Sequence, residues 1–379
     1  MRIALVHDYL REFGGAERVL KVLTEMYPEA PIYTAFSVID STAQKEFKNL
    51  RVFESFLAPL LKIGKLYSPL RFLIPWIWGG FDLSKYDLVI ASSGWYVTRG
   101  FKVGPKTKVI VYCHTPPRWL YGFETSVEFT KYWPVKLYSK IVGYFMRKYD
   151  FRVAQPIKYW VANSKNVAER VKKYYSKDAI VIYPPVDVAK INAASRQPSA
   201  VSREQKYFLV VSRLVGAKGI EAVVETFSDP SMSGYKLKIV GGAHGMSAVS
   251  RRLSATRNAN IEILGRVSDG QLYKLYAGAV ALICLAKEED FGMTPVEAMA
   301  AGTPVIAYNG GGYKESVIDG KTGVLMDKID KKTLIYTIKH FNELIHWKGL
   351  DEASQKQAER FSKERFIREF KNFVLKIMP

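Results

Sequence analysis

Short apolar runs that alternate with helical stretches are the feature that most limits how this chain of 379 residues can fold. Continuous apolar strands separated by helices are typical of parallel sheets covered on both faces. The pattern starts again after about residue 206, and a chain of this length exceeds what one hydrophobic core usually organises. We therefore predict two doubly wound α/β domains in tandem. The predicted strands lie at 3–6, 88–91, 109–112 and 160–162, and then at 207–211, 237–240, 261–264, 279–285 and 304–307.

The segment around residue 190 separates the two repeats of this pattern. The run YPPVD at 183–187 contains two consecutive prolines, and the polar stretch 192–205 shows no apolar periodicity. Both features are typical of a linker. We predict a first domain over 1–187 and a second over 206–360, followed by a C-terminal helix at about 362–379 whose apolar positions share one face.

The net charge of +20 implies an anionic partner, and much of it lies in the first half of the chain. Residues 1–190 hold 29 lysines and arginines against 16 aspartates and glutamates. No zinc-finger spacing, RRM signature or concentrated basic helix accompanies this charge, which argues against nucleic acid. The stretch 56–81 interleaves Leu, Ile, Phe and Trp with basic residues. That composition suits the surface of an anionic membrane, although a helical hairpin covering a core would show the same pattern.

The cysteines and the start of the chain bear on the compartment. Cys113 and Cys284 each lie in an apolar strand-like run, which predicts buried, reduced thiols and argues against a disulfide or a thiolate metal site. No run of about 18 uncharged apolar residues is present, and the opening MRIALVHD is too short and too soon acidic for a signal peptide. We expect a soluble, cytoplasmic protein.

Two candidate positions lie at strand ends of the first domain. Gly14 and Gly15 precede a predicted helix, so backbone amides there could meet an anion or a sugar hydroxyl, although a flexible helix entry is an equal interpretation. His114 follows the strand VIVYC directly. It could hydrogen-bond a substrate hydroxyl or carry a proton, or it could cap a proline-stiffened turn.

Two cations follow the first strand of the second domain, in FLVVSRLVGAKGIEAV. Arg213 and Lys218, together with a helix N-terminus, would stabilise a leaving diphosphate, whereas surface positions are the simpler interpretation. In LGRVSDGQLY, backbone groups around Val267 could contact a base, and Asp269 could accept from guanine. Ser268 or Asp269 would cap the helix that follows, and N-capping is the expected role for Asp269.

The stretch EEDFGMTPVEAMAAGTPVIA at 288–307 holds two glutamates, Glu289 and Glu297. A capping box explains Glu297, with Thr294 as N-cap and Pro295 at the first helical position, but it does not explain Glu289. The amides of Phe291, Gly292, Met293 and Thr294 precede the helix and could cradle a ligand.

Together these motifs resemble the retaining glycosyltransferases of the GT4 type, which have the GT-B fold. The resemblance rests on GGAE near the start, His114, SRLVGAKG, the pair Glu289 and Glu297, and AGTPVIA. The opening MRIALVHDYL and HTPPRW look most like mannosyltransferases of O-antigen and lipopolysaccharide assembly. The run YPPVD departs from the family's usual Asn-Gly-Val-Asp at the hinge.

The resemblance implies two Rossmann-like domains facing a cleft, with the C-terminal helix crossing back to the first domain. It further implies that Glu297 binds ribose, Glu289 and the amides 291–294 contact the sugar, and His114 contacts it from the first domain. Arg213 and Lys218 would neutralise the diphosphate, and Gly14 and Gly15 would lie beside the phosphates. Members need no metal, so no cofactor is expected beyond the nucleotide-sugar substrate.

The expected function is transfer of a hexose, mannose from GDP-mannose being favoured, to a lipid-linked or polysaccharide acceptor at the inner face of the cell membrane. The basic N-terminal domain would hold the enzyme on the anionic membrane as a peripheral protein. A UDP-sugar donor or a nucleotide-sugar epimerase is the alternative within this fold. A basic protein that binds a phosphate polymer is the non-enzymatic alternative.

Overall fold

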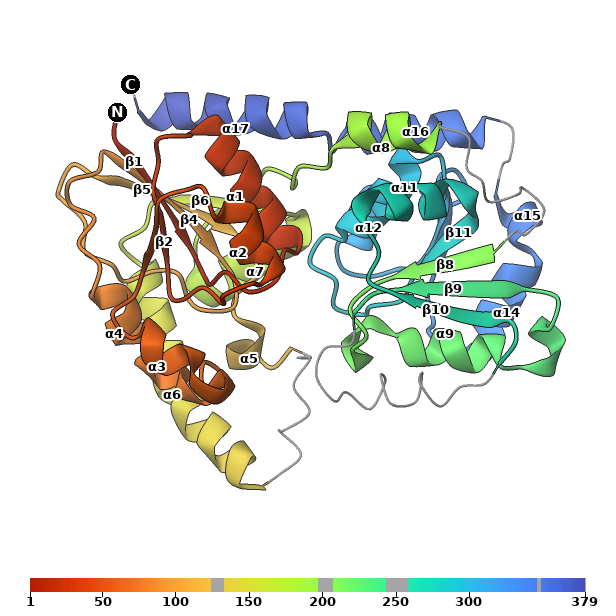
Figure 1. Cartoon of the computed structure of the whole chain (residues 1–379), viewed down its shortest axis with the longest axis horizontal. Coiled ribbons are helices and arrows are strands. Elements are labelled where there is room, and N and C mark those ends of the chain that lie inside the picture. The colour runs from red at the N-terminus through yellow and green to blue at the C-terminus, as the bar shows by residue number, and fades with distance from the viewer. Residues whose placement is uncertain (124–132, 197–206, 243–257, 346–348, 379) are drawn as a thin grey trace. The chain divides into compact units, whose positions relative to one another are not determined.

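The computed structural model describes residues 1–123, 133–196, 207–242, 258–345 and 349–378 (Figure 1). The chain forms two compact units. The first unit comprises Met1–Pro185 and Phe366–Pro379, and the second comprises Val186–Arg365. No helix among the described residues is long and apolar enough to cross a bilayer.

The first unit is built on a seven-stranded parallel sheet in the order β3-β2-β1-β4-β5-β6-β7. The four strands predicted in this part of the chain are confirmed, and the three additional strands are each two or three residues long. The strands are β1 Ile3–His7, β2 Ile32–Thr34, β3 Val52–Glu54, β4 Leu88–Ser93, β5 Lys108–Cys113, β6 Tyr159–Ala162 and β7 Ile180–Val181. The helices are α1 Gly15–Met26, α2 Thr42–Phe47, α3 Ala58–Lys62, α4 Ile74–Gly79, α5 Arg118–Tyr121, α6 Trp133–Ala154 and α7 Lys165–Tyr175, with 3-10 turns η1 Ile63–Lys65 and η2 Pro69–Leu73.

The last helix, α17 Lys363–Ile377, completes the core of the first unit. Phe366, Phe370 and Val374 are buried in one cluster with strand residues such as Leu5 and Ile90. Phe366 also packs edge-on against Tyr112, with ring centroids 5.9 Å apart. The apolar face predicted from the sequence therefore docks on the N-terminal sheet, and its burial stabilises a contact between the two ends of the chain.

The segment 56–81 packs in a second apolar cluster of the first unit, separate from the one that contains α17. Leu61, Ile74, Ile77 and Trp78 are fully buried in this second cluster, and the Trp78 indole donates to the Tyr96 carbonyl at 2.7 Å. The core-covering interpretation of this segment is therefore confirmed for these side chains. Other apolar side chains of the same segment are exposed, and they are considered below.

The second unit contains a six-stranded parallel sheet in the order β10-β9-β8-β11-β12-β13. All five strands predicted here are confirmed, and β13 is additional. Both sheets thus start at a central strand, build outward on one side and then on the other, which is the doubly wound topology. The strands are β8 Tyr207–Val211, β9 Lys236–Val240, β10 Ile261–Gly265, β11 Ala279–Cys284, β12 Val305–Tyr308 and β13 Gly323–Met326. The helices are α8 Val188–Ser195, α9 Ile220–Phe227, α11 Asp269–Gly278, α12 Met293–Ala300, α13 Tyr313–Ser316, α14 Lys331–Lys339, α15 Phe341–Leu344 and α16 Leu350–Glu359, with 3-10 turns η4 Gly216–Lys218 and η5 Pro230–Met232.

The predicted linker is partly wrong. Asp187 caps α8 by accepting from the Lys190 amide at 3.1 Å, so residues 192–195 continue a helix. Val188 and Ile191 on that helix are buried, and α8 packs on α11 and α12 in the second unit. Polar composition concealed this helix because only two of its side chains face the core. Residues 197–206 of the predicted linker lie outside the described residues.

Candidate active site

A chain of polar side chains lies at the topological switch point of the first sheet, where β1 neighbours both β2 and β4. Open α/β sheets bind their ligands at the carboxyl ends of the strands at this point. His7 ends β1, Ser92 lies near the end of β4, and His114 follows β5. The Ser92 hydroxyl is 3.0 Å from His7 Nδ1 and 2.7 Å from His114 Nε2, so it connects the two imidazoles.

The glycine pair of the GGAE motif lies at the start of α1. Gly14 is the N-cap of α1, and its amide donates to Glu17 Oε2 at 3.0 Å. The other oxygen of Glu17 is 3.4 Å from His7 Nε2. Glu17 therefore joins the helix start to the histidine chain. The sequence interpretation included neither Glu17, His7 nor Ser92 among its candidates, although Glu17 falls inside the quoted motif.

Burial controls the protonation of this part of the site. Burial, and to a smaller extent the nearby His7, lower the pKa of His114 to about 3. The imidazole of His114 is therefore neutral near pH 7 and can accept or donate through either nitrogen, depending on its tautomer. Burial also raises the pKa of Asp8, which accepts a hydrogen bond from the Thr98 hydroxyl.

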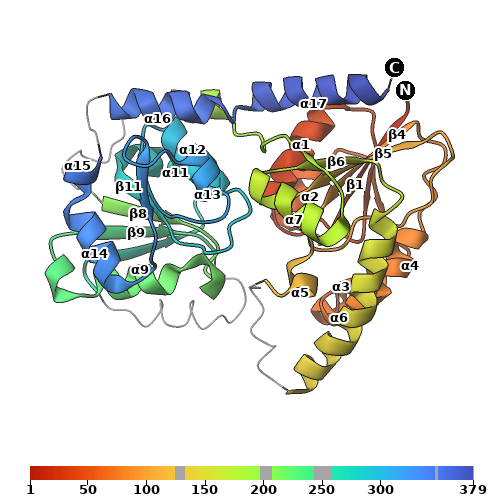
Figure 2. The ribbon, with the colours of Figure 1, turned by 180° about the vertical axis from the view of Figure 1, so that it is seen from behind.

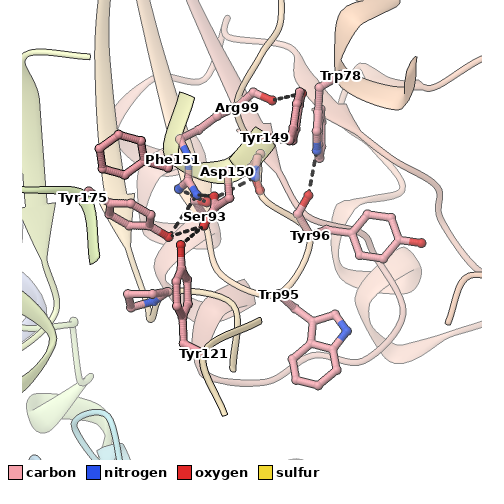
Figure 3. Close-up of polar contacts among 12 residues, drawn as sticks. Trp78, Ser93, Trp95, Tyr96, Arg99, Tyr121, Tyr149, Asp150, Phe151 and Tyr175 are labelled. Atoms are coloured by element: carbon pink, nitrogen blue, oxygen red, sulfur yellow. Dashed lines mark hydrogen bonds and ion pairs between the residues drawn. The ribbon is translucent and has the colours of Figure 1, made fainter. Parts of the chain in front are cut away.

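A buried ionic cluster supports the end of β4 (Figure 3). The Arg99 guanidinium pairs with Asp150, and both side chains are almost completely inaccessible, at 1% and 0% exposed. Tyr121 and Tyr175 donate to Asp150 at 2.8 and 2.9 Å, and Arg99 donates to the Ser93 hydroxyl at 3.1 Å. The cluster thus fixes the backbone next to Ser92.

In the second unit, the structure brings Lys218 and Glu289 together. Lys218 Nζ donates to Glu289 Oε2 at 2.5 Å, and both side chains remain partly accessible, at 24% and 15%. Lys218 ends η4 beyond β8, and Glu289 lies beyond β11. Since β8 and β11 are neighbours at the switch point of this sheet, the pair occupies its ligand-binding edge.

A glycine-rich turn after β12 supports Glu289, and the sequence interpretation missed it. The Gly312 amide donates to the Glu289 carbonyl at 2.9 Å, and a Cβ on Gly311 would lie only 2.3 Å from that same oxygen. Gly311 also has φ of +54°, a conformation that favours glycine. The signal was three consecutive glycines at 310–312, two residues beyond the predicted strand 304–307. The Tyr313 hydroxyl adds a long contact of 3.4 Å to Glu289 Oε2.

The predicted capping box at Thr294 is wrong. Helix α12 begins at Met293 with Gly292 as its N-cap in the left-handed region at φ of +84°, so Thr294 is already inside the helix. Glu297 therefore lies in the second turn, where it is 4% exposed and accepts from the buried Tyr276 hydroxyl at 2.8 Å. The predicted end of the helix is confirmed: Gly302 has φ of +83°, and its amide donates to the Met299 carbonyl at 3.0 Å.

The amide cradle proposed for 291–294 lies at the start of α12, beside Glu289. The side chain of Phe291 is buried and packs on Phe361 at 5.3 Å between centroids, so only its backbone is placed for binding. Gly292 could not carry a side chain, because a Cβ would lie 2.7 Å from the Tyr313 ring. Met293 and Thr294 are partly accessible.

The remaining candidates lie on neighbouring strand ends of the same sheet. Arg213 is exposed in the loop after β8, and Gly219 between Lys218 and α9 passes so close to Leu285 that a Cβ would lie 2.5 Å from its carbonyl oxygen. Val267 is half-buried after β10. Of the two N-cap candidates for α11, Ser268 is confirmed as the N-cap, and the cap role expected for Asp269 is wrong because Asp269 is the first helical residue.

Each unit thus holds a polar site at the carboxyl ends of its strands. The site of the second unit combines cations, a carboxylate and the backbone amides at the start of α12, which suits an anionic ligand that also carries hydroxyl groups. The site of the first unit combines neutral imidazole, hydroxyl and carboxylate groups. Two doubly wound units of this kind define the GT-B architecture.

Two family models match the chain, one to each half. Residues 13–190 match the Glycosyltransferase Family 4 model, and residues 192–361 match the model of glycosyl transferases group 1. The chain belongs to the glycosyltransferases, with family 4 and group 1 domains in that order.

Individual relatives agree with this assignment. The chain is 26% identical over 233 residues to an uncharacterized glycosyltransferase of Methanocaldococcus jannaschii, a match that covers 61% of this chain and 62% of the other. It is 24% identical over 331 residues to the alpha-1,3/1,6-mannosyltransferase ALG2 of Dictyostelium discoideum, covering 78% and 77%. It is 29% identical over 181 residues to a D-inositol 3-phosphate glycosyltransferase of Segniliparus rotundus, covering 44% and 40%. The chain therefore spans less than two thirds of the length of the first and third of these relatives.

Solved structures share the fold over the whole chain. The HepE protein of Anabaena, solved with UDP, has a TM-score of 0.69 at 17% identity and covers 99% of this chain and 100% of its own. The sucrose-phosphate synthase of Thermosynechococcus elongatus has a TM-score of 0.70 at 16% identity, covering 100% and 99%. The GT-B fold predicted from the sequence is confirmed.

Proposed function

We propose that the protein transfers mannose from GDP-mannose, with retention of configuration, to a lipid-linked or polysaccharide acceptor in cell-surface glycan synthesis. The main observation that supports a sugar-transfer reaction is the contact of Lys218 with Glu289 at the switch point of the second sheet. The preference for mannose is supported by the likeness to the Dictyostelium mannosyltransferase and by the HTPPRW run around His114.

The pair has a direct use in transfer of a sugar from a nucleoside diphosphate. An ammonium group has three donors, so Lys218 can hold Glu289 with one and a phosphate oxygen with the others. With Arg213 it would stabilise the charge that develops on the leaving diphosphate. Glu289, positioned by Lys218 and by the 310–312 turn, would accept from hydroxyls of the sugar.

The other residues complete a working hypothesis for the donor. The amides of 291–294 would bind the sugar and phosphate, and Glu297 would bind the ribose hydroxyls. His114 would contact the sugar as a neutral imidazole, and Gly14 and Gly15 would lie beside the phosphates. Val267 and Asp269 would contact the base. We propose that the cations and the start of α12 replace a divalent metal, so that a chelator leaves turnover unchanged.

A UDP-sugar is the alternative donor, and a specific observation supports it. The Anabaena HepE protein has been solved with UDP and with UDP-glucose, and it shares the whole fold. An epimerase would use the same fold and a similar donor site. It would release a modified sugar nucleotide and no free nucleoside diphosphate, which distinguishes it in any product analysis.

The donor can be identified by thermal shift with GDP, UDP, GDP-mannose and UDP-glucose. A ligand that binds the native state stabilises it by about 2.7 kcal/mol at 100 times its Kd, so the preferred nucleotide should raise Tm by several degrees. We expect GDP and GDP-mannose to give the larger shift. A larger shift with the uridine compounds would replace the mannose proposal, and no shift with any of them would refute the donor site.

Substitution of Glu289 tests the site itself. We expect Glu289→Gln to abolish turnover while the secondary structure and the GDP shift persist, because the change removes a sugar contact and leaves the diphosphate cations in place. Glu343→Gln, at an exposed glutamate of the same unit, is the matched control and should keep full activity. Equal activity of the two variants would contradict the assignment.

A further inference from the structure

Helix α6 carries an unusual second apolar face. Its side chains at Trp133, Leu137, Ile141, Tyr144 and Phe145 are each half or more exposed, up to 75% for Trp133. Their spacing of three or four residues places them on one side of the helix. A row of large exposed apolar groups of this length is uncommon on a soluble surface and marks a contact site.

The opposite side of α6 attaches the helix to the first unit. Gly143, Met146, Asp150 and Ala154 are buried, again at intervals of three or four residues. The helix is therefore held by one face and presents the other outward. The two views show α6 running beside α3 and α4 at the margin of this unit (Figures 1 and 2).

The charge around this row has one sign. The sequence from 133 to 149 contains Lys136, Lys140, Arg147 and Lys148 and no aspartate or glutamate. Lys148 Nζ lies 4.4 Å from the centre of the Tyr144 ring, so cation and aromatic group occupy the same surface. Long cationic side chains beside exposed aromatics can place their stems on apolar groups and their charges on phosphates.

The neighbouring segment extends the same surface. The Tyr138 hydroxyl donates to the Pro69 carbonyl, which joins α6 to η2. Residues 55–81 contain no aspartate or glutamate. Five large apolar side chains of this segment are 40% to 67% exposed: Phe56, Leu60, Ile63, Phe72 and Trp76. We call these five side chains, the exposed row of α6 and the lysines Lys136, Lys140 and Lys148 the apolar–basic face.

We propose that the apolar–basic face is a docking surface for a bilayer containing anionic lipid. Exposed aromatic and aliphatic groups would enter the interface, and the lysines would pair with lipid phosphates, each contributing electrostatic attraction. A second copy of the chain fits poorly, because a two-fold contact through this face would oppose the α6 cations of one copy to those of the other. The proposal deepens the proposed function, on which it rests for the lipid-linked acceptor.

The topology of the first sheet places the apolar–basic face at the carboxyl edge of the strands. The segment 55–81 follows the carboxyl end of β3, and α6 runs from the carboxyl end of β5 back to the start of β6. The more exposed first half of α6 is therefore on the edge of the sheet where His114 lies. A membrane bound there would present lipid head groups to the same edge as the proposed sugar site.

Vesicle flotation tests the proposal without any enzymatic assay. The full chain is mixed with vesicles of phosphatidylcholine alone or with 30% phosphatidylglycerol, at low and high salt. We expect binding to the anionic vesicles only, weakened by salt. The triple variant Leu137→Ser, Ile141→Ser and Phe145→Ser should lose more than tenfold in partitioning. Lys136→Gln, Lys140→Gln and Lys148→Gln together should lose about 100-fold at low salt, since each cation near such a surface contributes about 1 kcal/mol.

The matched control replaces three exposed apolar groups of the first unit outside this face: Ile39→Ser, Ile180→Ser and Leu375→Ser. It should bind vesicles like the unaltered chain. Equal losses in the control and α6 variants, or equal binding to neutral vesicles, would overturn the proposal. So would an α6 variant that converts a dimer to a monomer in light scattering, since a second copy would then be the occupant. The nucleotide thermal shift should be unchanged in every variant, so a failed donor site and a failed membrane face give different results.

Discussion

Replacing Asp150 by asparagine should destabilise the first unit by about 3 to 5 kcal/mol, because it leaves a buried cation without its counter-ion. The Arg99 side chain is 1% exposed, and Asp150 is the carboxylate with which it pairs. The rings of Trp160 and Tyr175 lie 5.4 and 5.0 Å from the guanidinium, but they offer weaker stabilisation than a charge. Asparagine keeps the shape and an acceptor for Tyr121 and Tyr175, so the change isolates the charge.

The effect is large enough to measure by urea unfolding. At a slope of about 2.5 kcal/mol per molar, the expected loss lowers the midpoint by about 1 to 2 M urea. Six of the seven tryptophans lie in residues 1–185, so intrinsic fluorescence reports mainly on the first unit. Arg99→Met combined with Asp150→Asn should recover part of the loss, because the lone buried charge is then gone.

The matched control is Asp178→Asn, which removes the partner of Lys172 in a pair that is 60% and 88% exposed. Exposed pairs contribute little, so its midpoint should barely move. If Asp150→Asn shifted the midpoint no more than Asp178→Asn, the cluster in Figure 3 would not be the electrostatic support of β4 described above.

Three further predictions concern the two sites. Gly311→Ala should abolish turnover in a nucleoside-diphosphate release assay by displacing the Glu289 carbonyl, whereas Gly320→Ala, with similar positive φ but open space around it, should stay active. The free energy of unfolding of the first unit should fall on acidification between pH 6.5 and about 3, because the unfolded chain protonates His114 while the folded chain keeps it neutral. His114→Gln should remove this dependence, which has a slope of about 1.4 kcal/mol per pH unit. Identical pH profiles of the two proteins would contradict the assigned pKa. Ser92→Ala should lower kcat about tenfold with little change in KM for the donor, because it removes the hydroxyl that bridges His7 and His114. An unchanged kcat in nucleoside-diphosphate release assays would exclude this positioning role of Ser92.

The α/β class and the grouping of the strands into two domains could be predicted from the sequence because local patterns show them. Nine apolar runs were predicted as strands from their composition and from the helical stretches between them, and every one is a strand. Three of the four strands that were missed, β2, β3 and β7, have three residues or fewer, and the fourth, β13, has four; runs this short show little periodicity to detect. The linker was partly misplaced for a related reason, since α8 buries only two apolar residues.

The candidate site also has parts that the sequence predicted and parts that it did not. Motif spacing placed Lys218 and Glu289 on separate loops, but only the parallel pairing of β8 with β11 brings them into contact across 71 residues of chain. Helix α12 begins after Gly292, which has a left-handed backbone and lies so close to the Tyr313 ring that no side chain fits there, and the sequence around Thr294 could not reveal that close approach.

The sequence by itself determined features that a few consecutive residues define: the strand runs, the glycine at a helix end, the charge of each segment and the spacing of Glu289 and Glu297. Tertiary structure alone decided which of these meet. It joined Glu17, His7, Ser92 and His114 into one chain, and it buried one face of α6 while leaving the other exposed. Periodicity shows that a face is apolar, but whether protein covers that face depends on distant segments of the chain.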